Sequence, residues 1–460
     1  MKNLTLSNIA SACGGKYVGP QELKDFVVTA ITTDSRKATN GCLFVAIQGE
    51  RADGHKFIPQ VMEKGAAAVL AEKAPADGTP YILTDSSLRA VKDIAEFYLK
   101  QLNIPVVGIA GSVGKTSTKE MTASVLGQKF RVLKTEGNFN NELGVPLTIF
   151  RLRDEDELAV LEMGISDLGE MHRLAKIVRP DTSIMTNIGF CHLENLKDRD
   201  GVLKAKSEIY DFLRPDDHII INGDDDKLHT IKEINGVRPV TYGLDSSNDV
   251  WADEIVSMGL KGISCHIHTE KGDFRVNIPM PGRHMVYNAL AGTAAGLVYG
   301  LDISLIRRGI ESFASLGGRF NMIETDKFMI IDDCYNANPV SMKASLDVLQ
   351  DGSGRKTAIL GDMGELGENE KELHADVGAY AASLDIDAVY CAGPLMENFA
   401  EAAKKASSKL EVRHFADLED LRSHLSELVG EGDTILVKAS HFMHFEKIVD
   451  DLRNVSGQTN

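Results

Sequence analysis

The segment Gly108-Ile-Ala-Gly-Ser-Val-Gly-Lys-Thr-Ser117 decides the fold of this chain. Its first residues close a buried-strand run, Val106–Ala110, and its last residues open a helical pattern that includes Met121 and Val125. Glycines let backbone N–H groups close around phosphate oxygens, and the N-terminus of a helix adds partial positive charge. The segment therefore predicts a phosphate-binding loop between a strand and a helix, and ATP binding is the function that it indicates most strongly.

Within this loop the Lys115 side chain is expected to reach the β- and γ-phosphates, and the Thr116 hydroxyl to coordinate Mg²⁺. Ile109 stands where the strict G-x-x-x-x-G-K-[ST] pattern requires glycine, so the spacing is instead G-x-x-G-x-x-G-K-T. The flanking strand and helix favour a phosphate site over a structural glycine-rich turn beside a surface lysine. The expected ATP-binding residues of the loop are Gly111, Ser112, Gly114, Lys115, Thr116 and Ser117.

Length and composition limit the class of protein. At roughly 150 residues per domain, 460 residues predict about three domains. The 43% hydrophobic and 25% charged residues are typical of a globular protein and exclude a disordered or collagen-like chain. The formal net charge of −17 argues against a nucleic-acid binder. The six cysteines are scattered and include no C-x-x-C pair, so we expect neither a disulfide framework nor a zinc site. The chain has no signal-peptide pattern and no apolar run of about 20 residues, so we expect a cytoplasmic protein without a membrane span.

Apolar strand runs alternate with helical patterns along the chain, which predicts an α/β fold built on parallel sheets with helices on both faces. We expect three domains, at 1–84, 85–316 and 317–460, and a helix at Ser87–Leu102 that leads into the central one. The expected strand runs are Val27–Ile31, Leu43–Ile47, Ala66–Leu70, Leu158–Leu161, Ile184–Thr186, Ile219–Ile221, Met329–Ile331, Ala358–Leu360, Ala388–Tyr390 and Ile435–Val437.

Polar residues follow these strand runs, at the edge where parallel sheets bind ligands. Glu162 and Asn187 follow two runs of the central part, while Asp333 and Lys438 follow two runs of the last part. The pattern predicts a cleft between two polar rims. Glu162 suits Mg²⁺, which often takes one or two protein carboxylates, although a solvated glutamate at a strand end has the same pattern.

The roles of three further residues stay open on residue type alone. His192, five residues after Asn187, is either a structural histidine or a metal ligand. Lys204 and Lys206 lie in an expected helix, Gly201–Phe212, where solvated surface lysines are the ordinary case.

These segments together resemble the Mur ligase family, which adds amino acids to the peptide stem of the cell-wall precursor. Gly111–Ser117, Asn138-Phe-Asn-Asn141, Glu162-Met-Gly164, Thr186-Asn-Ile-Gly189 and His192 are similar, in order, to the signature of its central domain. Gly282-Arg-His-Met-Val-Tyr-Asn288 resembles its adenine-side motif, except that Met285 stands where many members have another asparagine.

Within the family, three regions are similar to the members that add a dipeptide. Thr33-Asp-Ser-Arg36, with Leu43–Gly49 and Asp53–Phe57, resembles a UDP-binding N-terminal domain. Asp332–Pro339 and Leu360–Gly367 resemble segments of the dipeptide-adding subgroup. The implied activity is an ADP-forming ligase that joins D-alanyl-D-alanine to UDP-N-acetylmuramoyl-tripeptide through an acyl phosphate. The implied architecture is a small UDP-binding domain, a central phosphate-loop ATPase domain with a parallel sheet, and a Rossmann-like C-terminal domain that binds the dipeptide.

The resemblance also implies roles for individual residues. It makes Lys115, Glu162, His192 and Lys206 catalytic, with Lys206 carbamylated so that it offers oxygen ligands where an ammonium would repel a metal ion. Two Mg²⁺ ions are expected, held by Thr116, Glu162, His192 and the carbamate of Lys206. Asn288 and Arg319 are expected at ATP. The uridine substrate is assigned to Ser35, Arg36, Gly49, Asp53, Gly54, His55, Asn138 and Asn141, and the dipeptide rim to Asp333, Asn336, Asn338, Lys438 and His441.

One departure and several alternatives remain. Lys438-Ala-Ser-His441 stands where the family usually has Lys-Gly-Ser-Arg, and histidine lacks the planar five-donor fork of arginine. The alternatives are a tripeptide-forming relative, folylpolyglutamate synthase, a kinase or ATPase that makes no amide, and a nucleotide-gated binding protein. We expect a monomeric enzyme whose partners are small molecules only. The third residue of the peptide stem, diaminopimelate or lysine, stays open.

Overall fold

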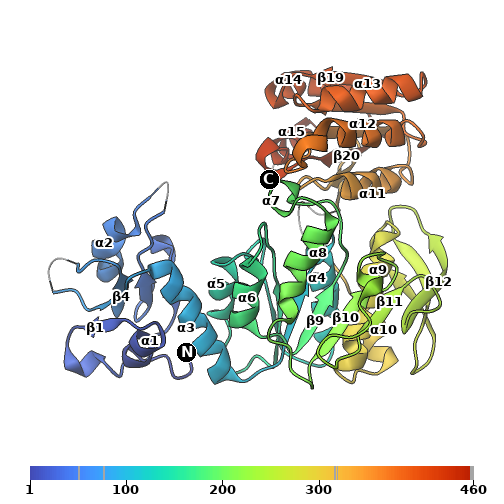
Figure 1. Ribbon diagram of the computed structural model, residues 1–460. Coiled ribbons are helices and arrows are strands. Elements are labelled where there is room, and N and C mark those ends of the chain that lie inside the picture. Colours follow the sequence, from blue (N-terminus) through green and yellow to red (C-terminus); the bar gives the residue numbers. More distant parts are fainter. Residues whose placement is uncertain (50–51, 76–77, 315–317, 319, 456–460) are drawn as a thin grey trace.

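The computed structural model describes residues 1–49, 52–75, 78–314, 318 and 320–455, and it contains three separate sheets. Their strands occupy residues 16–83, 106–278 and 321–438 in turn. Figure 1 shows the blue N-terminal part at one end of the green and yellow central part, with the orange and red C-terminal part above it. The expected α/β fold of three units is therefore confirmed.

The N-terminal sheet has the strand order β1-β5-β4-β3-β2. All its pairs are parallel except β1 with β5. The expected run Val27–Ile31 was wrong in extent, because only its last residue enters the short edge strand β2, while the chain before it bridges to Thr5. The strands are β1 Lys16–Val18, β2 Ile31–Thr32, β3 Leu43–Val45, β4 Ala68–Ala71 and β5 Tyr81–Leu83.

The central sheet has nine strands in the order β14-β13-β12-β11-β10-β9-β6-β8-β7. Strand β6 lies between β8 and β9, so the loops after these three strands meet at one edge. The strands are β6 Val106–Ala110, β7 Val132–Lys134, β8 Leu158–Glu162, β9 Thr182–Met185, β10 His218–Asn222, β11 Val240–Gly243, β12 Val250–Ser257, β13 Ile263–His268 and β14 Phe274–Ile278.

The expected parallel central sheet is confirmed from β7 to β12, and an antiparallel edge extends it. Strands β12, β13 and β14 pair antiparallel and extend the parallel part at its far edge. In β13 and β14 buried and more exposed residues alternate, as in a sheet with one face on the core and one face toward solvent. Their pattern therefore differs from the continuous apolar runs of the buried parallel strands.

The C-terminal sheet has the order β15-β16-β20-β17-β18-β19, with only β15 antiparallel to its neighbour. Strands β16, β20 and β17 lie side by side, which brings together the residues that follow them. The strands are β15 Asn321–Glu324, β16 Met329–Asp332, β17 Lys356–Gly361, β18 Ala388–Ala392, β19 Glu411–Phe415 and β20 Thr434–Lys438.

Helices connect most of the parallel strands, because parallel neighbours need a crossover connection. The helix α3, Ser87–Leu102, has the predicted bounds: Ser86 caps its start by accepting from the Arg89 N–H, and Asn103 ends it with φ +53°. The other α-helices are α1 Leu6–Ala12, α2 Ile58–Glu63, α4 Lys115–Leu126, α5 Gly144–Ile149, α6 Glu170–Val178, α7 Leu193–Leu196, α8 Arg199–Ser207, α9 His284–Val298, α10 Ile303–Glu311, α11 Pro339–Leu349, α12 Glu370–Ala381, α13 Met396–Ala406, α14 Leu418–Leu428 and α15 Glu446–Val455.

The helix expected at Gly201–Phe212 begins two residues earlier, at Arg199, because Asp198 caps it by accepting from the Gly201 N–H. It ends at Ser207, and one 3₁₀ turn, Glu208–Tyr210, follows. Among the described helices, none combines the length and the apolar character that a membrane crossing requires.

Candidate active site

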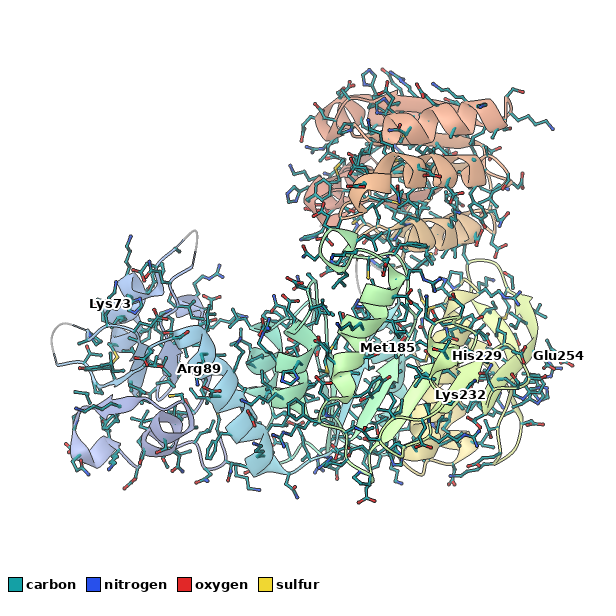
Figure 2. The ribbon with its side chains drawn as sticks, in the orientation of Figure 1. Lys73, Arg89, Met185, His229, Lys232 and Glu254 are labelled. Atoms are coloured by element: carbon teal, nitrogen blue, oxygen red, sulfur yellow. The ribbon has the colours of Figure 1, made fainter. Side chains whose placement is uncertain are left out.

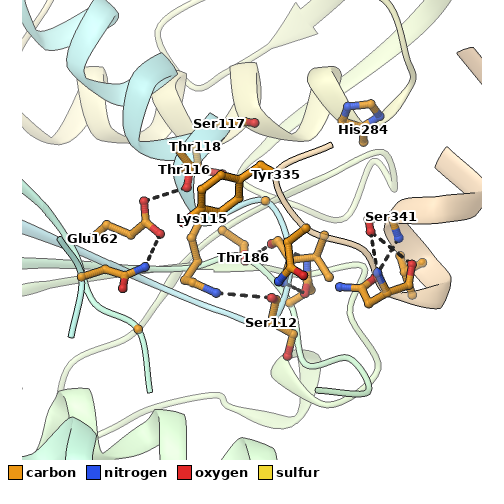
Figure 3. A pocket seen from close by; sticks show the side chains of 18 of the residues that line it. Ser112, Lys115, Thr116, Ser117, Thr118, Glu162, Thr186, His284, Tyr335 and Ser341 are labelled. Atoms are coloured by element: carbon orange, nitrogen blue, oxygen red, sulfur yellow. Dashed lines mark hydrogen bonds between the residues drawn. The ribbon is translucent and has the colours of Figure 1, made fainter. Parts of the chain in front are cut away.

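A cavity of about 680 Å³ lies where the loops of the central sheet face the C-terminal domain. Figure 3 shows the phosphate loop and Glu162 together with Tyr335 and Ser341, which belong to the C-terminal domain. The sequence-predicted residues that line it are Ser112, Gly114, Lys115, Thr116, Ser117, Asn138, Asn141, Glu162, His192, Asn288, Asp333, Asn336, Asn338 and Lys438. The two predicted polar rims therefore share one cavity.

The loop between β6 and α4 depends on two glycines with positive φ. Gly111 has φ +142° and Gly114 has φ +81°, values that L side chains rarely adopt. A Cβ at Gly111 would also lie 1.9 Å from the Thr186 hydroxyl oxygen. The glycines thus let the chain turn tightly enough for α4 to begin at Lys115.

Residues after β9 hold this loop in place. The Val113 N–H donates to the Asn187 side-chain oxygen at 3.0 Å, and the Asn187 amide donates back to the Val113 carbonyl at 3.0 Å. The Thr186 hydroxyl donates to the same carbonyl at 2.7 Å, and the Ser112 N–H donates to the Asn187 carbonyl at 2.9 Å. The loop is therefore preorganised by groups from a neighbouring strand.

Lys115 places a cation over the loop at the N-terminus of α4. Its ammonium donates to the carbonyls of Gly111, at 2.9 Å, and Ser112, at 3.3 Å. The positive end of the helix dipole and the ammonium act in the same direction, so this part of the cavity favours a polyanion.

Glu162, the last residue of β8, has a carboxylate that is 1% exposed and fixed at both oxygens. One oxygen accepts from the Thr116 hydroxyl and the other from the Asn140 amide, both at 2.8 Å. The ammonium of Lys119 lies 4.0 Å from it. A carboxylate and a hydroxyl at this spacing are hard oxygen ligands of the type that Mg²⁺ prefers, so the residues fit such an ion.

Lys206 is 1% exposed, so it is not a solvated surface lysine. Burial, and then the nearby charge of Lys115, lower its pKa from 10.5 to about 8. Lys204, two residues earlier on α8, is exposed. The two lysines that look alike in the sequence thus differ completely in environment.

His192 links the central domain to the C-terminal domain. Its Nδ1 lies 2.8 Å from a carboxylate oxygen of Glu365, which follows β17 and has φ +60°. This hydrogen bond lowers the pKa of Glu365 against the effect of burial. Sequence reasoning missed Glu365, although it lies in the segment Leu360–Gly367.

The C-terminal rim is built around a buried ion pair. The ammonium of Lys438 lies 2.5 Å from an oxygen of Asp333, and it also donates to the Asn336 carbonyl at 3.0 Å. The Ser345 hydroxyl donates to the same Asp333 oxygen at 2.7 Å. Asn338 forms a capping box with Ser341 at the start of α11, which fixes where this rim begins.

The other predicted residues of this side have different surroundings. The His441 ring packs against the Tyr335 ring, with centroids 5.5 Å apart, and it is not among the described residues that line the cavity. Arg319 lies outside the described residues.

In the segment expected to contact adenine, Asn288 accepts from the Thr118 hydroxyl at 2.9 Å, and its amide lies 3.2 Å from the Met285 sulfur. Met285, at the position where many members of the family have another asparagine, therefore packs against Asn288. His284, which sequence reasoning did not single out, lines the cavity; its Nε2 is buried without a hydrogen-bond partner among the described residues. Burial lowers its pKa from 6.5 to about 4, which keeps the imidazole neutral.

The predicted uridine-binding residues fall into two groups. Asn138 and Asn141 line the cavity, whereas Ser35, Arg36, Gly49, Asp53, Gly54 and His55 belong to the N-terminal domain and are outside its described lining. Arg36 forms a two-bond ion pair with Asp34. The Nδ1 atom of His55 lies 2.7 Å from an Asp53 oxygen. A Cβ at Gly54 would lie 2.7 Å from the Ile47 nitrogen, so this turn requires glycine.

Comparisons with known proteins agree with this geometry. The chain is 39% identical over 97% of its length to UDP-N-acetylmuramoyl-tripeptide--D-alanyl-D-alanine ligase of Bacillus subtilis, of which 98% is covered. It is 34% identical to the protein of the same name in Escherichia coli, with 98% and 99% covered.

Solved structures are similar over nearly the whole chain. MurF from Acinetobacter baumannii has a TM-score of 0.87 at 33% identity, with 98% of both chains covered. The MurF ligase of Thermotoga maritima, solved in complex with ADP, has a TM-score of 0.83 at 29% identity, with 94% of this chain and 99% of that chain covered.

Three family models match in succession: the Mur ligase family catalytic domain at residues 27–116, the Mur ligase middle domain at 109–296, and the Mur ligase glutamate ligase domain at 318–441. Together they span the phosphate loop, both rims of the cavity and most of the chain. The chain therefore belongs to the Mur ligase family.

Proposed function

We propose that this protein is an ATP-dependent, ADP-forming ligase that joins D-alanyl-D-alanine to UDP-N-acetylmuramoyl-tripeptide and so forms the pentapeptide precursor of peptidoglycan. The observation that carries the proposal is the single cavity shared by a phosphate loop and a facing polar rim. The curated relatives, at 39% and 34% identity, are named for this reaction, and one similar structure holds ADP.

The first step transfers the γ-phosphoryl group of ATP to the terminal carboxylate of the tripeptide, and ADP leaves. This converts a poor electrophile into an acyl phosphate, but it requires two anions to approach each other. The Lys115 ammonium and the N–H groups at the start of α4 offset the repulsion. Groups that are already in position do this without reorganisation at the moment of transfer.

In the second step the amine nitrogen of the dipeptide bonds to the carbonyl carbon, the carbon–oxygen bond to phosphate breaks, and the amine loses a proton. We assign the dipeptide to the rim of Asp333, Asn336, Asn338 and Lys438, which lies across the cavity from the phosphate loop. The buried Asp333–Lys438 pair fixes this rim, so that approach of the two domains aligns amine and acyl phosphate.

We propose further that two Mg²⁺ ions bind here, one at Thr116 and Glu162 and one at His192 and a carbamylated Lys206. The ions would neutralise the charge of the triphosphate. The low pKa of Lys206 supports this assignment, because carbon dioxide reacts with a neutral amine, and the Lys115 cation would stabilise the carbamate anion. An ammonium at this position would instead repel a metal ion.

The remaining assignments follow the three units of the fold. We infer that residues 1–84 bind the uridine diphosphate through the residues around Arg36 and His55, that 85–316 bind ATP, with Asn288 toward adenine, and that 317–460 bind the dipeptide. We also propose that the protein acts as a monomer. The small-molecule, nucleotide substrates support a cytoplasmic location.

The test measures phosphate release with ATP, Mg²⁺ and UDP-N-acetylmuramoyl-tripeptide, with and without D-alanyl-D-alanine, together with the mass of the product. Release that depends on the dipeptide, with a product heavier by one dipeptide minus water, supports the proposal. Release without any amine would indicate an ATPase, and release that depends on a folate would indicate a folylpolyglutamate synthase.

Two lysines on one helix give a matched test of the carbamate. Lys206→Ala should be inactive and partly restored by a short added carboxylate such as formate, whereas Lys204→Ala should keep its activity because its side chain is exposed. Full activity of Lys206→Ala without added carboxylate would contradict the assignment.

A further inference from the structure

A second group of metal-binding side chains lies on the antiparallel edge of the central sheet. It consists of Asp253 on β12 with His266 and His268 on β13, and one potential ligand atom from each lies within 4.8 Å of the other two. None of the three is among the residues that line the cavity. Figure 2 labels the neighbouring residue, Glu254, at the outer margin of the central domain, away from the C-terminal part.

The strand register explains why these side chains meet. His266 and His268 are two residues apart on β13, so they project from the same face, while Cys265 and Ile267 are buried on the other. Across the antiparallel pair, Asp253 is directly opposite His266, and Trp251 is opposite His268. The arrangement therefore follows from regular pairing, before the bulge that shifts the register after Asp253.

We propose that Asp253, His266 and His268 bind a divalent transition-metal ion, with Zn²⁺ as the best match. Imidazole and carboxylate ligands suit Zn²⁺, which is commonly held by three protein groups and a water. Bonds of about 2.0–2.1 Å in a tetrahedron place ligand atoms roughly 3.3 Å apart. Here one Asp253 oxygen lies 3.0 Å from Nε2 of His268 and 3.9 Å from Nδ1 of His266, so small side-chain movements suffice.

Asp273 acts on this site through His268. One of its oxygens lies 3.3 Å from Nδ1 of His268, while Nε2 of the same ring faces Asp253. A proton held on Nδ1 by Asp273 leaves the Nε2 lone pair for the metal, the common arrangement of a metal-bound histidine and a second carboxylate. Trp251 stacks on the ring, with centroids 3.9 Å apart and planes at 14°, and limits its rotation. We therefore assign Asp273 and Trp251 as positioning residues.

The nearby charges favour a cation. The two carboxylates face two imidazoles, which are neutral once their protons are released, so a dication finds compensating charge. Arg275, opposite His266 on β14, is the nearest basic residue on this ladder, and it forms an ion pair with Glu254. Its charge is thus already matched.

Trp251 is the only tryptophan of the chain, so its fluorescence reports this site. We would titrate Zn²⁺, and separately the quencher Cu²⁺, into the metal-stripped full chain with excess Mg²⁺ and no ATP. Calorimetry would give the number of ions bound. The wild type should show a saturable fluorescence change. His266→Gln and Asp253→Asn should each lose that change and about one bound ion.

The matched control is His172→Gln, because His172 also lies beside a carboxylate, Asp211 at 2.6 Å, but outside this cluster. It should keep the full response. Asp273→Asn should weaken binding about 10- to 100-fold without abolishing it, as for other residues that orient a metal-bound histidine. An unchanged Trp251 response in both His266→Gln and Asp253→Asn, or a wild type that responds to pH but not to either metal, would overturn the proposal whatever the ligase activity.

Discussion

Replacement of Lys206 by methionine should stabilise the protein without its ligands at neutral pH, although it should abolish ligase activity. The Lys206 ammonium is 1% exposed and forms its strongest charge interaction with another cation, Lys115. Methionine has nearly the same length and no charge. The substitution therefore removes a desolvated and repelled cation and leaves the packing of α8 nearly unchanged.

The size of the effect follows from the pKa. A fall from 10.5 to about 8 corresponds to about 3 kcal/mol, at about 1.4 kcal/mol per pKa unit. Below pH 8 both folded and unfolded chains carry the proton, so the full cost is present. Between pH 8 and 10.5 the folded chain has lost the proton and the unfolded chain still binds it, so the cost falls as pH rises, and above 10.5 it is gone.

Urea unfolding followed by Trp251 fluorescence measures this difference, because Trp251 lies in the central sheet and Lys206 lies on α8 of the same domain. In buffer free of carbon dioxide, Lys206→Met should exceed the wild type by about 3 kcal/mol at pH 7 and by about 1 kcal/mol at pH 9.5. Lys204→Met, with its exposed side chain, should match the wild type at both values.

Equal stability of Lys206→Met and the wild type at pH 7 would refute the reasoning, and so would a difference that does not shrink as pH rises. Added bicarbonate provides a second check. If the neutral amine is carbamylated, bicarbonate should change the stability of the wild type, and it should leave Lys206→Met unaffected.

Three further substitutions test other parts of the cavity. Lys115→Ala should reduce turnover at least ~10²- to 10³-fold, measured as phosphate release, by analogy with removal of one preorganised charge donor. Gly111→Ala should abolish ATP binding in calorimetry, because its Cβ would lie 1.9 Å from the Thr186 hydroxyl; nearly unchanged affinity would contradict this. Lys438→Met should cost about 3–5 kcal/mol in thermal unfolding, because it leaves the buried Asp333 carboxylate without its partner, and a smaller loss would show that water reaches the carboxylate.

The sequence predicted those elements whose local pattern agrees with their tertiary setting. The helix Ser87–Leu102 and the strand Val106–Ala110 have the predicted bounds, because the helix has a serine cap and an apolar stripe and the strand is buried throughout. The edge strands of the central sheet were missed. In Ile263–His268, buried and exposed residues alternate, and a search for continuous apolar runs passes over that pattern.

Site residues that directly follow a predicted strand could be predicted from the sequence. Contacts between residues of two distant segments could not. Glu162 follows such a predicted strand, and the cavity contains it as expected. Its partners Asn140 and Lys119 depend on the path of the loop after β7 and on the face of α4 that is buried. Glu365 contacts His192 only because two domains approach each other, which no local pattern specifies.

Buried lysines mark this site more sharply than any single motif. Among the described residues, the lysines that are at most 2% exposed are Lys119, Lys206 and Lys438. Lys119 lies 4.0 Å from Glu162, Lys206 interacts with Lys115, and Lys438 lines the cavity itself. Charged side chains are rarely buried unless they are paired, because desolvation is costly. Lys119 and Lys438 pair with Glu120 and Asp333, so their charges are matched, whereas Lys206 interacts with a second cation, and its burial is the cost of the position at which we propose a carbamate.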